Sequence, residues 1–223
     1  MGLRKALGLR KPSVRIEQPR TPRLQPIPGA PDPSVWFRDK DLTTDWLSNN
    51  VWAWFSALAP LVGKECRVLE VGSFEGRSAI AFLEYLPRSK VDCVDKFPTF
   101  AVEERFDRNL ATYGDRVTKI KKRACDALDW AQSNGSRYDV IYLDAEKSRQ
   151  GVFALSVLAW PLLQCGGIMI WDDLVWGQDR SAADRPEYGI RLFCKTFASC
   201  IEILHDHRQM IARKIAEWPT GPA

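Results

Sequence analysis

The sequence has little histidine, no paired cysteine motif and no long apolar run. His205 and His207 are its only histidines, which gives no support for a catalytic Ser–His or Cys–His pair. The six cysteines form no CxxC pair, and most lie in or beside apolar runs, so we expect reduced core thiols rather than disulfides or a zinc site. There is no stretch of about 18 apolar residues and no pattern typical of a secretory signal. We therefore expect a cytoplasmic protein without a transmembrane segment.

Basic residues and prolines are concentrated at the N-terminus. Residues 1–40 carry nine Lys or Arg against three Asp or Glu, and seven of the 14 prolines, within a chain of net charge +4. Such a segment cannot form a continuous helix, so we predict a mobile extension at 1–40 and one domain at 41–223. The extension could touch an acidic surface, or it could simply lead into the domain.

Strand and helix patterns alternate along the rest of the chain, which is typical of a parallel sheet covered by helices. A helix is predicted over Asp41–Leu61, where large apolar residues recur at helical spacing. Further helices are expected over 79–86, 101–113, from 124, over 152–163 and over 188–198. Strands are expected over 66–71, 90–95, 116–120, from 138 and over 168–171, followed by a hairpin of 200–205 and 210–215.

A glycine-containing turn links the first strand to the next helix. Glu70 ends the strand, and the turn Gly72-Ser73-Phe74-Glu75-Gly76-Arg77-Ser78 follows it. The glycines allow a sharp turn and a close approach of the backbone to a ligand. The pattern E-x-G-x-x-x-G differs from the G-x-G-x-x-G fingerprint of dinucleotide sites, which argues against NAD.

This turn resembles motif I of class I S-adenosylmethionine-dependent methyltransferases. The resemblance implies a Rossmann-like α/β fold, with a seven-stranded, mostly parallel sheet, a C-terminal antiparallel hairpin and helices on both faces. In that family the loop contacts the methionine part of the cofactor, and an acid ending the second strand accepts hydrogen bonds from the ribose hydroxyls. The adenine contact is expected near 124–126, with Asp126 favoured. The resemblance thus implies a cofactor site made of Glu70, Gly72, Ser73, Gly76, Ser78, Asp95, Cys125, Asp126 and Asp144.

Three further carboxylates follow two strands that we expect to be neighbours. Asp144 follows the fourth strand, and Asp172 and Asp173 follow the fifth. Because parallel strands end at one crevice, these side chains can meet there as ligands of a hard divalent cation such as Mg²⁺. The alternative is that they only cap strands and hold loops.

The same stretch resembles metal-dependent O-methyltransferases of the catechol and caffeoyl-coenzyme A type. In those enzymes an Asp ends strand four and an Asp-Asn pair ends strand five, so Asp173 departs from the pattern. The resemblance implies a catalytic pair of Asp144 and Lys147, with Lys147 at the general-base position. The chain is also similar to bacterial methyltransferases of surface-glycan and secondary-metabolite pathways, in which metal dependence is not general.

Several functions remain open at this point. The first is O-methylation of a small molecule such as a sugar, a glycan precursor or a secondary metabolite. A metal-dependent hydroxylase-like relative and a non-catalytic binding module are the alternatives. Trp171, Trp176 and Tyr188 could stack on an acceptor ring near the mouth of the cleft. The chain lacks an Asn-Pro-Pro-Tyr motif, so we expect no nucleic-acid substrate, and the oligomeric state is open, a homo-oligomer included.

Overall fold

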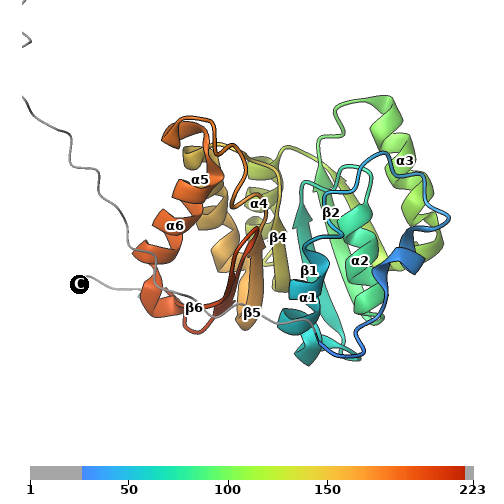
Figure 1. The fold of residues 1–223 in the computed structure, drawn as a ribbon, viewed down its shortest axis with the longest axis horizontal. Helices are drawn as coiled ribbons and strands as arrows, with labels where there is room; N and C mark the ends of the chain where they lie inside the picture. Colours follow the sequence, from blue (N-terminus) through green and yellow to red (C-terminus); the bar gives the residue numbers. More distant parts are fainter. Residues whose placement is uncertain (1–26, 219–223) are drawn as a thin grey trace, which may run out of the picture.

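The computed structural model describes residues 27–218 and contains one sheet of seven strands in the order β3-β2-β1-β4-β5-β7-β6 (Figure 1). Neighbouring strands from β1 to β5 are parallel, and β7 runs antiparallel to both β5 and β6. The predicted fold is therefore confirmed. The strands are β1 (Cys66–Val71), β2 (Ser89–Asp95), β3 (Val117–Lys121), β4 (Tyr138–Leu143), β5 (Leu163–Trp171), β6 (Ile201–Asp206) and β7 (Met210–Lys214).

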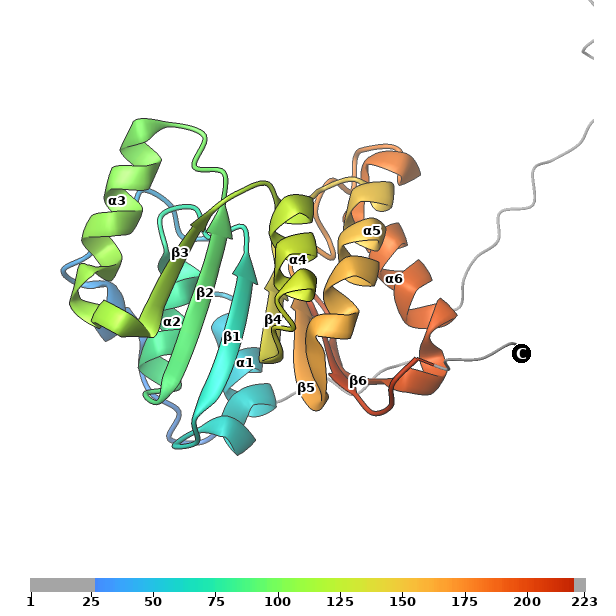
Figure 2. The ribbon, with the colours of Figure 1, turned by 180° about the vertical axis from the view of Figure 1, so that it is seen from behind.

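Within residues 27–218, six α-helices cover the two faces of the sheet. They are α1 (Val51–Leu58), α2 (Arg77–Tyr85), α3 (Phe100–Leu110), α4 (Ala124–Ser133), α5 (Arg149–Ala159) and α6 (Pro186–Thr196). Buried residues of α1, α2 and α3 share one core cluster, and those of α4, α5 and α6 share the other. Figure 2 shows α4, α5 and α6 on the face opposite to α1 and α2. Along β1, Val68 packs in the first cluster and Leu69 in the second, as the alternation of side chains in a strand requires.

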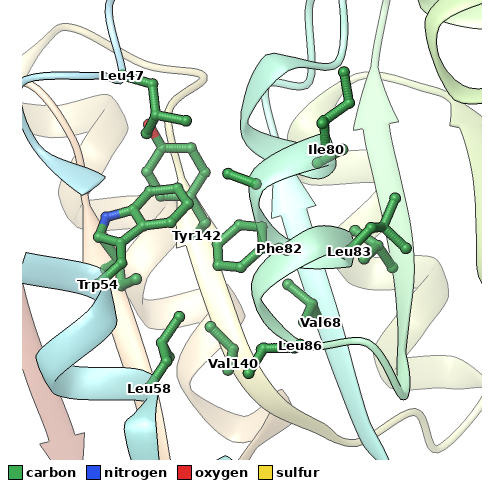
Figure 3. Packing of buried hydrophobic residues seen from close by; sticks show 14 of the residues in the cluster. Leu47, Trp54, Leu58, Val68, Ile80, Phe82, Leu83, Leu86, Val140 and Tyr142 are labelled. Carbon is green, nitrogen blue, oxygen red and sulfur yellow. The ribbon is translucent and has the colours of Figure 1, made fainter. Parts of the chain in front are cut away.

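Aromatic residues fill the core between α1, α2 and the sheet. The Trp54 ring stacks on Phe82 with centroids 4.4 Å apart, and Tyr142 meets Trp54 edge-on at 5.0 Å (Figure 3). All three side chains are buried. This cluster fixes α1 and α2 against the strand whose end leads to Asp144.

The first helix is shorter than predicted, because residues 41–50 form a loop and α1 begins only at Val51. Side chains from other elements bind the backbone of this loop. The carboxylate of Glu75 accepts hydrogen bonds from the Thr43 amide at 2.7 Å and from its hydroxyl at 2.8 Å. Polar partners of this kind compete with helix formation. The loop consequently lies at the edge of the sheet where the strands end.

Residues on the N-terminal side of the predicted domain boundary at Asp41 also pack against the domain. Pro33–Phe37 forms a short 3-10 helix, and the Trp36 ring meets Phe55 edge-on with centroids 5.8 Å apart. The Arg77 guanidinium lies 4.6 Å from the centre of the Phe37 ring. Most of the predicted basic extension, residues 1–26, lies outside the described residues, as do 219–223. No helix between 27 and 218 is long and apolar enough to cross a bilayer.

Candidate active site

A cleft of about 890 Å³ opens at the carboxyl ends of the parallel strands. Its walls come from the loop before α1 and from the turns that follow β1, β2, β3, β4 and β5. The predicted site residues that line it are Gly72, Ser73, Ser78, Asp95, Cys125, Asp144, Lys147, Asp172 and Asp173. Glu70, Gly76 and Asp126 are not among the lining residues.

The turn after β1 brings the backbone close to the end of β4. Gly72 has a φ of 106°, and a Cβ added there would lie 2.5 Å from the carbonyl oxygen of Asp144. Only glycine therefore fits this position. Gly76 is the N-cap of α2, with a φ of 88°, and packs against Leu110 of α3. Its contribution is to shape the turn rather than to line the cleft.

Glu70 lies beneath this turn as a fully buried carboxyl group. Neither of its oxygens forms a hydrogen bond of good geometry within the described chain. Burial raises the pKa of Glu70 to about 7, against the smaller opposing effect of the neighbouring Ser73 and Ser78 hydroxyls. The buried carboxyl thus keeps unused acceptor capacity beneath the turn.

Asp95 connects two loops at the rim of the cleft. One carboxylate oxygen accepts a hydrogen bond from the Phe74 amide at 2.9 Å, and the other accepts from the Phe97 amide at 2.6 Å. Phe74 and Phe97 both have positive φ, 48° and 49°. The Asp95 carboxylate thus stabilises the strained turns at Phe74 and Phe97, and it also lines the cleft.

The segment before α4 forms the side of the cleft next to Asp95. Lys122, Arg123, Ala124 and Cys125 line this wall, and Cys125 is exposed. Asp126, the residue favoured for the adenine contact, lies in the first turn of α4 and does not line the cleft. The helix turns it away because adjacent helical residues are about 100° apart around the axis.

Lys147 lies between two of the carboxylates predicted as metal ligands. Its ammonium nitrogen donates to Asp144 at 2.5 Å and forms a second ion pair with Asp173. Burial of Lys147 opposes its charge, but the two carboxylates outweigh it and raise the pKa of the lysine. Burial raises the pKa of Asp144, and the nearby charge of Asp172 adds to the effect. Lys147 is therefore the cation of this cluster at neutral pH.

The third carboxylate, Asp172, is held by groups from distant parts of the chain. The Tyr142 hydroxyl donates to it at 2.6 Å, and the Gln209 amide donates at 3.0 Å. Gln209 in turn accepts a hydrogen bond from the indole of Trp54 at 2.8 Å. Burial and the charge of Asp172 raise the pKa of Tyr142, so the tyrosine stays a donor. The sequence analysis missed these partners, which lie far from Asp172 along the chain.

The three carboxylates do not fit a divalent cation in this arrangement. All of them reach the same edge of the sheet, as predicted, but two bind Lys147 and the third accepts hydrogen bonds from Tyr142 and Gln209. Across residues 27–218, no group of three or more His, Cys, Asp or Glu side chains has the arrangement of a metal site. The donor chemistry suits magnesium, but an ammonium already satisfies two of the three carboxylates.

Aromatic residues border the open side of the cleft, although not all of those predicted. Trp176 lines it, and Trp46, with 66% of its surface exposed, rests on Phe74 with ring centroids 5.6 Å apart. The prediction for Trp171 was wrong: its side chain is fully buried and its indole donates to Ser156 at 2.8 Å. Trp171 faces the α5 and α6 side because side chains alternate along β5. Tyr188 does not line the cleft.

The two histidines of the sequence, His205 and His207, lie in the β6–β7 hairpin. His205 is buried and meets Trp52 edge-on at 5.2 Å, and neither His205 nor His207 lines the cleft. The structure therefore gives no histidine to the candidate site within the described residues.

Comparison with known proteins finds similarity to methyltransferases over part of the chain. A family model described as a methyltransferase domain matches residues 69–174. A curated protein named O-methyltransferase hkm8, from Aspergillus hancockii, is 32% identical over 126 residues. The match covers 54% of this chain and 47% of that protein, so the chain spans about half the length of this relative.

Solved structures share the fold. MycE methyltransferase from the mycinamycin biosynthetic pathway, in complex with Mg and SAH, superposes with a TM-score of 0.60 at 17% identity, over 85% of this chain and 55% of that one. An O-methyltransferase from Bacillus cereus in complex with SAH gives 0.55 at 22% identity, over 67% and 74% of the two chains. At these identities the likeness shows the fold alone.

Proposed function

We propose that this chain, which carries a methyltransferase domain with the class I fold, transfers a methyl group from S-adenosylmethionine to an oxygen of a small molecule. The observation that carries the proposal is the convergence of the Gly72 turn, Asp95 and the Asp144–Lys147 pair on one cleft. The 32% identity with a protein named as an O-methyltransferase supports oxygen as the acceptor atom.

The residues of the cleft fit the cofactor chemically. The backbone at Gly72 offers a cradle that a side chain would fill, and the buried carboxyl of Glu70 beneath it has unused acceptor capacity, which suits a cationic amino group. The Asp95 carboxylate can accept hydrogen bonds from two vicinal hydroxyls. The turn at Gly72 and the Asp95 carboxylate, which both line the cleft, would hold the methionine and ribose parts, and the wall at 122–125 would be left for the adenine.

When bound, S-adenosylmethionine supplies a methyl group on a positively charged sulfur. Transfer of this methyl group to an acceptor hydroxyl would leave the cofactor as a neutral thioether, and a group of this chain would have to take up the hydroxyl proton. Asp144, whose pKa burial raises, can take up that proton from its position at the end of β4. Lys147 is less suited as the base because the neighbouring carboxylates raise its pKa and keep it protonated. Rigid placement of the two reactants supplies much of the remaining rate enhancement.

The open side of the cleft suits a flat or apolar acceptor. Trp46 and Trp176 both line it, and they come from the loop before α1 and the segment after β5. Aromatic faces of this kind stack on sugar or aromatic rings. We therefore include both classes of small molecule as acceptors, among them glycan precursors and secondary metabolites.

The proposal is tested by incubating the protein with S-adenosylmethionine and a panel of catechols, phenols and sugars. Mass spectrometry then measures S-adenosylhomocysteine and the methylated acceptor. We expect turnover with at least one acceptor class, and its loss in Asp144→Asn with S-adenosylhomocysteine binding retained. Absence of both turnover and binding would instead favour a non-catalytic module, and oxygen-dependent hydroxylation would favour the hydroxylase-like alternative.

A further inference from the structure

Lys147 occupies the space between the ends of β4 and β5. Its ammonium nitrogen is 2.5 Å from a carboxylate oxygen of Asp144 and is also bonded to the carboxylate of Asp173. Asp173 adopts a positive φ of 59°, a conformation that costs free energy for a residue with a side chain. The amide of this strained residue donates to the Asp172 carboxylate at 2.8 Å, so the turn is fixed locally. The turn holds the Asp173 carboxylate against the lysine.

Both carboxylate oxygens of Asp172 already accept hydrogen bonds. One oxygen accepts from Tyr142, and the other accepts from Gln209 and from the Asp173 amide. The Tyr142 and Gln209 side chains are buried, and the bond from Trp54 to Gln209 ties the network to α1. Breaking these bonds would leave buried donors without partners, which is costly. Asp172 is therefore a poor third ligand for a cation placed between Asp144 and Asp173.

The charge of the cluster is partly balanced without a metal. Three carboxylates face one ammonium, and the lysine forms ion pairs with two of them. A lysine ammonium has three donor hydrogens. Two are used by Asp144 and Asp173, and the third has no protein partner among the described residues. This third donor is available to an acceptor oxygen in the cleft.

We propose that the ammonium of Lys147 takes the place of the divalent cation in this site, keeps metal ions out and binds the acceptor oxygen through its third donor. This inference deepens the proposed function of the same cleft and rests on it for the role of the acceptor. The exclusion of metal depends only on the cluster itself. The two parts therefore need separate measurements.

The exclusion of metal is tested by titrating Mn²⁺ alone into the full chain and recording free Mn²⁺ by electron paramagnetic resonance. The variants are Lys147→Met, which keeps an unbranched side chain only one atom shorter and removes the charge, and Lys147→Gln. The matched control is Lys119→Met, because Lys119 also joins two carboxylates, Glu103 and Asp107, each at 2.8 Å, away from the cleft. All variants are first compared by circular dichroism and thermal unfolding.

We expect Lys147→Met and Lys147→Gln to bind one Mn²⁺ ion. Their affinity for Mn²⁺ should be at least about tenfold higher than that of the wild type or of Lys119→Met, neither of which should bind the ion over the same concentration range. Asp144, Asp173 and water would ligate the ion in those variants, as is usual for cations of this kind. Stoichiometric binding by the wild type would overturn the proposal. It would also be overturned if neither folded Lys147 variant gained affinity, or if Lys119→Met gained as much.

The role toward the acceptor is tested with an acceptor found in the turnover assay. We expect the activity of the wild type to be unchanged by chelator, and Lys147→Met to raise the KM for the acceptor while S-adenosylhomocysteine affinity stays the same. Loss of wild-type activity in chelator would contradict the inference. If no S-adenosylhomocysteine binds to any form, the proposed function itself fails, while the Mn²⁺ result still decides whether the lysine excludes metal.

Discussion

Replacing Asp95 by Asn should weaken cofactor binding while the protein stays folded. The carboxylate accepts two backbone hydrogen bonds, from Phe74 at 2.9 Å and from Phe97 at 2.6 Å, and lines the cleft beside them. A bond from a ribose hydroxyl to a charged acceptor contributes about 1.5–3 kcal/mol. Asn keeps one acceptor oxygen, so the loss of one such bond lowers binding by about 1.5–3 kcal/mol, or about tenfold to a hundredfold in dissociation constant.

Calorimetric titration of S-adenosylhomocysteine measures this change directly. Asp129→Asn is the matched control, because Asp129 is exposed on α4, does not line the cleft and loses the same charge. Thermal unfolding reports the cost to the fold, which should be about 1–3 kcal/mol because the amide side chain keeps one acceptor oxygen. A folded Asp95→Asn protein with an affinity within about threefold of the wild type would refute the assignment of Asp95 to the ribose.

Three further changes probe the surroundings of the cleft. Gly72→Ala should lower the free energy of unfolding by about 2 kcal/mol or more and abolish cofactor binding, because its Cβ would lie 2.5 Å from the Asp144 carbonyl; urea unfolding and calorimetry check both effects. Glu70 has a folded pKa of about 7, above its value of 4.5 in the unfolded chain, so the native state binds the extra proton and stability falls as pH rises between these values. In Glu70→Gln, the free energy of unfolding should no longer fall by the about 3 kcal/mol that Glu70 contributes between these pH values. If the pH profile of unfolding were the same as in the wild type, the raised pKa of Glu70 would be contradicted. Tyr142→Phe leaves Oδ2 of Asp172 without its donor and should cost about 1–3 kcal/mol in urea unfolding; a change below about 0.3 kcal/mol would show that the bond contributes little.

The sheet was predictable because its strands are short apolar runs separated by turn residues. β1 has the predicted bounds and β4 the predicted start, and the bounds of β2, β3, β6 and β7 differ from the prediction by one residue at one or both ends. β5 differs most: it begins at Leu163 rather than at Ile168, and its pairing with β4 is shifted near Tyr138. Gly166, with a φ of 85°, lies in this irregular stretch, where the sequence pattern indicated a turn.

The loop at 41–50 was not predictable as a loop from its own residues. Its apolar residues recur at helical spacing, which favours a helix. Its backbone is instead bound by side chains from distant elements, such as Glu75 at Thr43 and Asn109 at Asp41. The residues of the loop alone do not indicate such distant partners. The conformation of 41–50 is therefore determined by tertiary contacts rather than by the local pattern.

The candidate site was predictable where it depends on strand ends. Asp95, Asp144, Asp172 and Asp173 reach one cleft because parallel strands end at the same edge. The hydrogen bonds of these residues were not predictable, since the Gln209 partner of Asp172 comes from the turn before β7. The position of Lys147 between carboxylates also depends on the fold, because Asp173 lies on the neighbouring strand end.

The most direct test of the account is a calorimetric titration of S-adenosylhomocysteine into the wild-type protein held in excess chelator, repeated with magnesium in place of chelator. The account predicts saturable micromolar binding at one site, with the same affinity in both conditions, because Lys147 rather than a metal balances Asp144 and Asp173. Absence of binding in both conditions would contradict the methyltransferase function proposed for this cleft, and binding only with magnesium would contradict the role given to the lysine.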